Sequence, residues 1–204
     1  MDGYNYIEFI VPGLIMMTVI TNSYANVVSS FYGSKFQGNI AEMLVSPTPN
    51  WIILAGFVGG GVARGMAVGI AVTIVSLIFS NLTIQHPILM ITIGLLTSTL
   101  FSLAGLINAV FARSFDDISI VPTFVLTPLT YLGGVFYSIN MLSDFWQWLS
   151  LMNPVLYMVN GFRYGVLGIA DISPWTSFAV IIAFIIGLSI YSLSLLNRGV
   201  GIRT

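Results

Sequence analysis

The stretch that decides the fold is WIILAGFVGGGVARGMAVGIAVTIVSLIF, from Trp51 to Phe79, in which Arg64 is the only charged residue. A helix needs about 20 mostly apolar residues to cross the hydrocarbon core of a bilayer. A charge at the centre of that core costs about 2.5–3.5 kcal/mol on insertion scales. We therefore expect the lipid-buried part to cover residues 64–80, with Arg64 extending to the inner headgroups. Contact with a substrate in a water-filled cavity is the alternative role for Arg64.

The composition of the whole chain points the same way. Of its 204 residues, 57% are hydrophobic and 6% are charged, and the mean hydropathy is +0.97. A soluble domain carries about 25% charged residues, so this chain is predicted to be an integral membrane protein. The net charge of -1 provides no basic field for nucleic acid. The absence of cysteine excludes disulfides, cysteine–zinc sites and thiol nucleophiles.

Four further stretches also meet the length criterion for a membrane span. Two long connections lie between the spans, a polar one at 29–50 and a mixed one at 138–174. The prediction is an all-α, polytopic membrane protein that forms one transmembrane domain over residues 1–204. Its expected spans are residues 7–28, 64–80, 88–112, 118–137 and 175–196.

Basic residues determine the orientation, because loops rich in Lys and Arg stay in the cytoplasm. With five spans, the basic residues in the first long connection, in the turn after the third span and after the last span fall on one side. The other side receives His86, Asp144 and Arg163, together with the N-terminus of the sequence. We therefore expect a further span before this sequence and six spans in the complete unit. The four residues placed in the cytoplasm are Lys35, Arg113, Arg198 and Arg203.

The inventory of reactive residues excludes most chemistry. The only lysine is Lys35, in GSKF, so the chain has no Gly-Lys-Ser/Thr phosphate-binding loop. Every carboxylate is expected in a loop or at a span end, which disfavours an ion-coupled secondary transporter. His86 stands alone beside Pro87, so no metal site or catalytic pair is predicted, and the chain is not expected to be an enzyme. A membrane scaffold that uses energy from elsewhere, or acts passively, remains.

The first connection contains a candidate docking segment. A short helix near residues 35–44 would be ended by Ser46-Pro47-Thr48-Pro49. This helix could contact a cytoplasmic partner, or it could lie on the membrane as an ordinary interfacial helix. Its polar residues are Lys35, Gln37 and Glu42, and its apolar residues are Phe36, Met43 and Leu44.

Two further patterns have both structural and functional interpretations. Gly61, Gly65 and Gly69 recur on one helix face, where small residues let helices approach closely, either within the chain or between two copies. Asp116 and Asp117 follow Arg113 at the start of a span. Adjacent helical residues point about 100° apart, so the two carboxylates converge poorly on one substrate. Capping and the helix dipole favour them as a helix start at the cytoplasmic turn.

The second connection is expected to form short helices at the outer face. Trp146 and Trp148 favour the headgroup zone, and Pro154 breaks the segment before Tyr157. Two roles are open for Arg163: contact with an anionic substrate, or a structural tie to Asp144 or Asp171. The structural tie is favoured, because buried charges usually have a partner.

Three motifs resemble the permease subunit of type-2 ATP-binding-cassette (ABC-2) exporters, in the bacterial inner-membrane group that has a separate ATPase chain. The first is FIVPGLIMMTVITNSYANVVSSF followed by AEMLVSP, which is similar to the second span and the coupling segment of that family. The second is FDDISIVPTFVLTPLTYLGGVFY, and the third is NPVLYMVNGFRYG, which contains Pro154, Tyr157 and Arg163. Together with the sequence between them, they extend the resemblance from Tyr6 to Arg203.

The resemblance implies a homodimeric pore in the inner membrane, with short re-entrant outer helices capping the pathway. It implies one ATPase subunit on each half, which carries the ATP and Mg²⁺, whereas this chain binds no cofactor. Family members begin with an amphipathic segment and a first span that have no counterpart here. A truncated or non-transporting scaffold is the alternative function, and a secondary transporter is a third. The implied coupling residues are Lys35, Phe36, Gln37, Glu42, Met43, Leu44 and Pro47.

Overall fold

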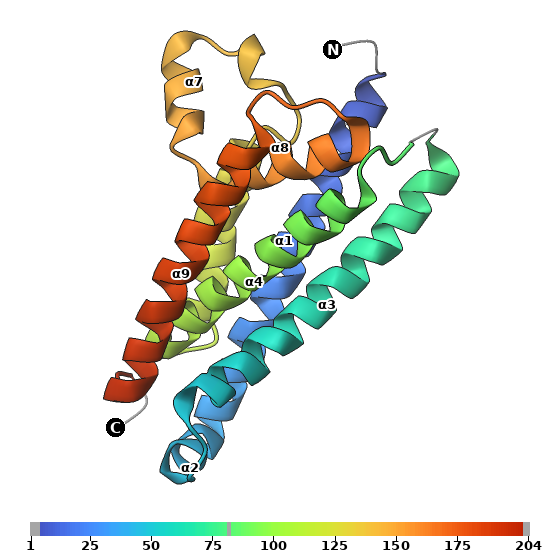
Figure 1. Cartoon of the computed structure of the whole chain (residues 1–204). Helices are drawn as coiled ribbons and strands as arrows, with labels where there is room; N and C mark the ends of the chain where they lie inside the picture. Colours follow the sequence, from blue (N-terminus) through green and yellow to red (C-terminus); the bar gives the residue numbers. More distant parts are fainter. Residues whose placement is uncertain (1–4, 81–82, 202–204) are drawn as a thin grey trace.

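The computed structural model describes residues 5–80 and 83–201, without the side chains of Ala41 and Leu44, and every regular element in that part is helical. Figure 1 shows α1, α3 and α4 running side by side, with α9 along a second face of α4. The all-α polytopic fold class is thereby confirmed. Its long helices are α1 (Tyr6–Phe36), α3 (Asn50–Phe79), α4 (Pro87–Phe111) and α9 (Pro174–Arg198). All four are long and apolar enough to cross a membrane.

Two of these helices are longer than a bilayer requires. α1 has 31 residues and α3 has 30, which at about 1.5 Å per residue is roughly 45 Å. The hydrocarbon core is about 30 Å thick. α1 therefore continues past the expected end of its span at residue 28, and α3 begins well before residue 64. Both extensions lie at the end of the bundle that carries α2 (Asn39–Val45), as Figure 1 shows.

The expected fourth span, at 118–137, is shorter and more irregular than predicted. It consists of α5 (Asp117–Val121), a π-helical turn η1 (Pro122–Leu126) and α6 (Thr127–Tyr131). Pro122 and Pro128 lack the N–H groups that a regular α-helix would use there, and the Thr127 hydroxyl donates to the Pro122 carbonyl at 3.0 Å. Gly134 then takes a left-handed conformation at φ +71° and turns the chain away. The helical run thus ends at Tyr131.

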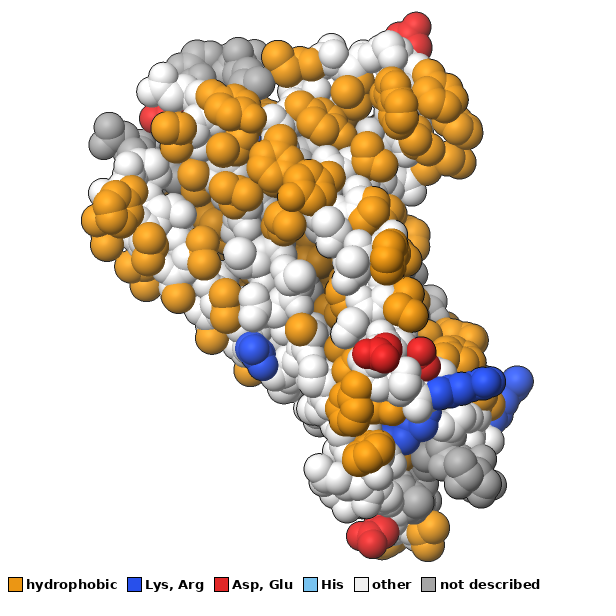
Figure 2. All heavy atoms as spheres, turned by 180° about the vertical axis from the view of Figure 1, so that it is seen from behind, with side chains coloured by type: hydrophobic (Ala, Val, Ile, Leu, Met, Phe, Trp, Pro, Cys, Tyr) orange, Lys and Arg blue, Asp and Glu red, His pale blue; other side chains and the backbone are white. Residues whose placement is uncertain are grey.

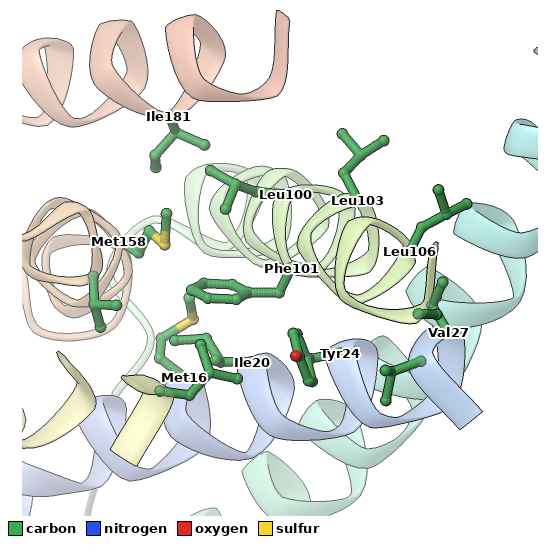
Figure 3. Close-up of a cluster of buried hydrophobic side chains, with 14 of the residues drawn as sticks. Met16, Ile20, Tyr24, Val27, Leu100, Phe101, Leu103, Leu106, Met158 and Ile181 are labelled. Carbon is green, nitrogen blue, oxygen red and sulfur yellow. The ribbon is translucent and has the colours of Figure 1, made fainter. Parts of the chain in front are cut away.

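The core lies between α1 and α4 and continues to α8 and α9. In Figure 3, Met16, Ile20 and Tyr24 of α1 point toward Phe101 and Leu100 of α4, and Met158 of α8 and Ile181 of α9 close the cluster. Lipid is as apolar as these side chains, so close packing and hydrogen bonding, more than the hydrophobic effect, hold such helices together. α3 contributes little to this cluster. Only 11% of the residues in its most apolar 18-residue stretch are buried inside the protein.

Small residues set how closely α3 and α4 approach α1. A methyl group added at Gly61 would collide with Ser102, one at Gly65 with Ser23, and one at Gly69 with Val19. The structure thus places all three glycines of the predicted stripe against helices of the same chain. At Gly105 of α4 the obstacle is backbone, because a Cβ there would lie 2.7 Å from the Tyr24 carbonyl oxygen, which cannot rotate away as a side chain can.

The end opposite α2 is closed by short elements. They are the 3-10 turn η2 (Ile139–Met141), α7 (Asp144–Leu151) and α8 (Pro154–Leu167). Figure 1 shows α7 and α8 covering this end. α7 leaves Trp146 and Trp148 exposed, whereas most of α8 is buried against α1, α4 and α9.

We expect Gly105→Ala to destabilise the bundle by about 1–3 kcal/mol, a magnitude typical of overpacking. The backbone of Tyr24 cannot rotate away from the added methyl group, so α1 and α4 must separate. Gly59→Ala is the matched control, because a Cβ at Gly59 has no atom within 4 Å. The measurement is the thermal unfolding midpoint of the purified chain in detergent. Equal midpoints for the two variants would contradict this account of the packing.

Candidate functional site

The end of the bundle that carries α2 is organised around one lysine. Lys35 lies in the last turn of α1, and its half-buried side chain reaches across to α4. The ammonium Nζ donates to the Val110 and Ala112 carbonyl oxygens, both at 2.8 Å. Helix C-termini expose carbonyls without partners and carry partial negative charge. Lys35 therefore caps α4 and fixes the end of α1 to it, so its charge does not face a partner.

Three aromatic side chains reinforce the same junction. Tyr32 packs edge-on against Phe115 with ring centroids 4.9 Å apart, and Phe36 packs against Phe115 at 5.4 Å. Tyr32 is buried, whereas Phe36 is 70% and Phe115 is 56% exposed. The aromatic cluster thus joins the end of α1 to the turn between α4 and α5 and leaves two large apolar surfaces uncovered.

The two aspartates of this turn have different environments. Asp117 accepts hydrogen bonds from the backbone N–H groups of Arg113 at 2.8 Å and Ser114 at 3.1 Å. The bond from Arg113 is the main cause, and bonds with Ser114 add to it, so the pKa of Asp117 lies below its usual value. Asp116 is exposed, and its side chain makes no cap hydrogen bond. The carboxylates do not converge, so the pair forms a turn and not an acid–base site.

The predicted docking helix is present as α2. It follows Gly38, whose φ of +82° suits glycine, and it ends at Ser46 before Pro47. Ile40 is buried, so one face of α2 packs inward. A groove of about 340 Å³ lies beside it, lined by Met43, Ser46, Thr48, Ile52, Ile53, Gly56 and Phe57.

We define the coupling surface as the exposed residues of α2 and the adjoining junction. Of the predicted coupling set, the structure brings together five exposed residues, whereas Lys35 is held within the bundle and the side chain of Leu44 lies outside the described part. Sequence reasoning missed Phe115, whose proximity to α1 depends on the fold. The members of the coupling surface are Phe36, Gln37, Glu42, Met43, Pro47, Phe115 and Asp116.

The charge distribution marks this end of the molecule. Figure 2 shows the visible Lys and Arg side chains in the half that carries α2, with apolar side chains covering the other half. Arg64 is exposed midway along α3. Helical side chains tilt toward the N-terminus of their helix, and for α3 that direction leads to the α2 end. The geometry therefore suits a guanidinium that extends to the inner headgroups.

The opposite end is held by a second set of polar contacts. The Asn153 side chain caps α8 by accepting from the Val155 N–H at 3.0 Å, and it donates to the Leu129 carbonyl at 2.6 Å. Pro154 follows as the first residue of α8. The Tyr157 hydroxyl donates to the Leu151 carbonyl at 2.8 Å and so holds the turn between α7 and α8. Pro154 and Tyr157 thus shape the cap.

Arg163 makes a structural tie, but to a different partner from the one expected. Its Nη2 donates to the Gly134 carbonyl at 2.6 Å, and its guanidinium carbon lies 3.9 Å from the centre of the Phe9 ring. Asp144 is exposed. Asp171 accepts from Ser138, Ile139 and Asn140 instead. The expectation of a carboxylate partner was wrong, because backbone carbonyls freed by the Gly134 turn bind the guanidinium.

No arrangement in the described residues supplies a metal centre, since no three His, Asp or Glu side chains lie together. What the fold defines is a helical membrane protein with a tightly tied, partly exposed end and a capped opposite end, which is the architecture of a membrane transport subunit. The chain belongs to the ABC-2 type transporter family, whose profile matches residues 1–167. It is therefore a multi-pass permease of the bacterial inner membrane.

The similarity to characterised sequences extends over the whole chain. It is 58% identical to the inner membrane transport permease YadH of Escherichia coli strain K12 over 204 residues, which is all of this chain and 80% of that protein. It is 20% identical to Nodulation protein J of Rhizobium leguminosarum bv. viciae over 198 residues, or 97% of this chain and 76% of that protein.

Asp117→Asn should lower the thermal unfolding midpoint at pH 7, because the ionised carboxylate holds the turn more strongly than a neutral amide does. A lowered native pKa gives stability that is present above the unfolded value of about 3.9 and is lost as the pH falls through the native value. The difference from the unmodified chain should therefore shrink below about pH 4. Asp116→Asn is the control and should change little at either pH. A deficit for Asp117→Asn that is independent of pH would refute the electrostatic explanation.

Proposed function

We propose that this chain is the membrane half of an ATP-driven exporter, and that a separate ATPase subunit docks on the coupling surface. The observation behind this proposal is that large apolar side chains at that end are exposed although they are held in fixed positions. Phe36 and Phe115 are large, apolar and exposed, yet they belong to a cluster that is fixed to α1 and α4. The helices here extend beyond the hydrocarbon core of the bilayer, so docking of a protein partner would remove these rings from water.

Charge supports the choice of partner surface. Glu42 is exposed next to Met43 in α2, and Asp116 is exposed next to Phe115, which packs against Phe36, so the surface offers apolar side chains with acidic neighbours. Such a centre with a polar rim is typical of protein interfaces. The family resemblance and the relative's designation as a transport permease make an ATPase the natural occupant.

The junction provides a route by which docking could move the bundle. A push on α2 or Phe36 reaches Phe115 through the aromatic cluster and reaches the end of α4 through Lys35. Beyond the turn at Asp117 lies the π-helical turn η1, and such turns are common at functional sites. We infer that α5 and α6 reorient about η1 while α1 and α4 stay packed. The partner would supply ATP and Mg²⁺, and two copies of this chain would form the pathway.

Docking can be tested by co-expressing this chain with the proposed ATPase subunit and purifying the two together. We expect Glu42→Lys and Met43→Glu to reduce recovery of the ATPase by roughly tenfold, as for a loss of about 1.4 kcal/mol at an interface. Asp144→Lys, an exposed charge reversal at the opposite end, should leave recovery unchanged. Unaltered recovery in both coupling-surface variants would show that this surface is not the docking site.

Lys35→Gln provides a sharper distinction within the predicted coupling set. Because the ammonium caps α4, this variant should lower the unfolding midpoint of the isolated permease, whereas Glu42→Lys should not. A Lys35→Gln chain of normal stability that still loses the ATPase would assign Lys35 to direct docking.

Transport in proteoliposomes that requires ATP, and that an ion gradient alone cannot drive, is the expected readout for the whole proposal.

A further inference from the structure

Arg163 has hydrogen-bonding capacity that the fold does not use. It is only 1% exposed and is among the largest fully buried side chains of the chain. A guanidinium has five N–H donors. Nη2 binds the Gly134 carbonyl and more distantly the Val135 carbonyl. Nε and Nη1 are buried and have no partner in the described residues. A buried charge with unsatisfied donors is costly, so an acceptor for these two nitrogens is required.

A cavity lies directly beside this side chain. It has a volume of about 200 Å³, and Arg163 forms part of its wall at the end of the bundle opposite α2. The volume is several times the roughly 30 Å³ that one water molecule occupies in the liquid, so it accommodates a small polar group. Its other polar lining residues are Ser138, Asn140 and Asp171, with Phe9 and Ala170 among the apolar ones.

The carboxylate in the same wall does not meet the need of Arg163. One Asp171 oxygen accepts from the Ser138 hydroxyl at 2.6 Å and the Asn140 amide at 3.3 Å, and the other accepts from the Ile139 N–H at 3.1 Å. Asp171 makes no ion pair with Arg163. Burial lowers the pKa of Arg163 to about 10, and the Asp171 charge opposes this decrease, so the guanidinium stays charged at neutral pH. The charged guanidinium beside the cavity therefore keeps two donors without an acceptor among the described residues, and both are covered by protein atoms in this conformation.

We propose that this cavity is a binding site for an oxyanion group, a phosphate or a carboxylate, held by the Nε–Nη1 edge of Arg163. That edge presents two parallel N–H donors, which match two oxygens of such a group. Nε and Nη1 are covered in this conformation, so the ligand reaches them when the cavity wall shifts. The wall is formed partly by the 138–140 segment, which is tied to Asp171 by three hydrogen bonds. The proposal concerns binding by this chain alone and does not rest on coupling to an ATPase.

The oxyanion could belong to a lipid headgroup or to a water-soluble molecule, and the experiment distinguishes the two. The purified chain in neutral detergent is titrated with inorganic phosphate, acetate or short-chain phosphatidylglycerol, against chloride at equal ionic strength. The readout is the thermal unfolding midpoint as a function of ligand concentration. Saturable stabilisation by at least one of the three is expected. A response to phosphatidylglycerol alone assigns a lipid headgroup, and a response to phosphate or acetate assigns a soluble anion.

Variants then place the site. Ala170→Leu fills the cavity without altering any hydrogen bond of Arg163, and it should weaken the apparent affinity by roughly tenfold or more, the loss of one charge-assisted contact. Arg163→Lys keeps the charge but removes the paired donors, and it should have a similar effect if it folds. Arg64→Gln, an exposed cation on α3, should retain full affinity. The proposal is overturned if no anion stabilises the chain beyond chloride, or if Ala170→Leu binds as tightly as the unmodified chain.

Discussion

The contact on which the rest of the structure depends is the pair of hydrogen bonds from the Lys35 ammonium to the Val110 and Ala112 carbonyls. Between apolar helices in lipid there is little hydrophobic driving force, so polar contacts and close packing fix the register. Lys35 sets where α1 ends relative to α4. The close contact of Gly105 in α4 with the Tyr24 backbone in α1 belongs to that register. The turn to α5, and with it the exposed position of Phe115, follows from the same capped end.

The closely packed helices and the irregular helices lie in different parts of the bundle. α1 and α4 form the most extensive interface in the chain, and their contact is filled by large buried side chains (Figure 3). The segment from α5 to α6 is short, broken by a π-turn and largely exposed. A force applied at the coupling surface reaches both parts, and the second contains the π-helical turn η1, which can absorb a change in direction. This contrast is why the proposed motion is assigned to η1 and not to the core.

The parts of the fold that depend on local composition could be predicted from the sequence. Long apolar runs located the four long helices, and the prolines after Ser46 marked the end of α2, whereas its start after Gly38 was expected earlier, near Lys35. The excess length of α1 and α3 was not predicted, because helix beyond the bilayer carries no hydropathy signal. The fourth span was predicted too long, because its end is set by the turn at Gly134 and by Arg163 binding the carbonyls there. In the coupling set, the polar position of Glu42 followed from amphipathic spacing, whereas the inward direction of Lys35 depends on where α4 ends.

Lys35 and Arg163 show why basic residues in such a chain are hard to assign from sequence. Each was expected to meet a partner or a carboxylate, and each binds backbone carbonyls. A carbonyl leaves no mark in the sequence, since every residue has one, and only the end of a helix or a tight turn frees it to accept. The two sites then diverge by geometry. Lys35 places its one compact charge between two carbonyls and is satisfied. The guanidinium of Arg163 has more donors, and the carbonyls at Gly134 and Val135 accept only from Nη2. Its Nε and Nη1 have no acceptor in the part of the chain that the structure describes, so this structural contact beside a cavity is also a candidate binding site.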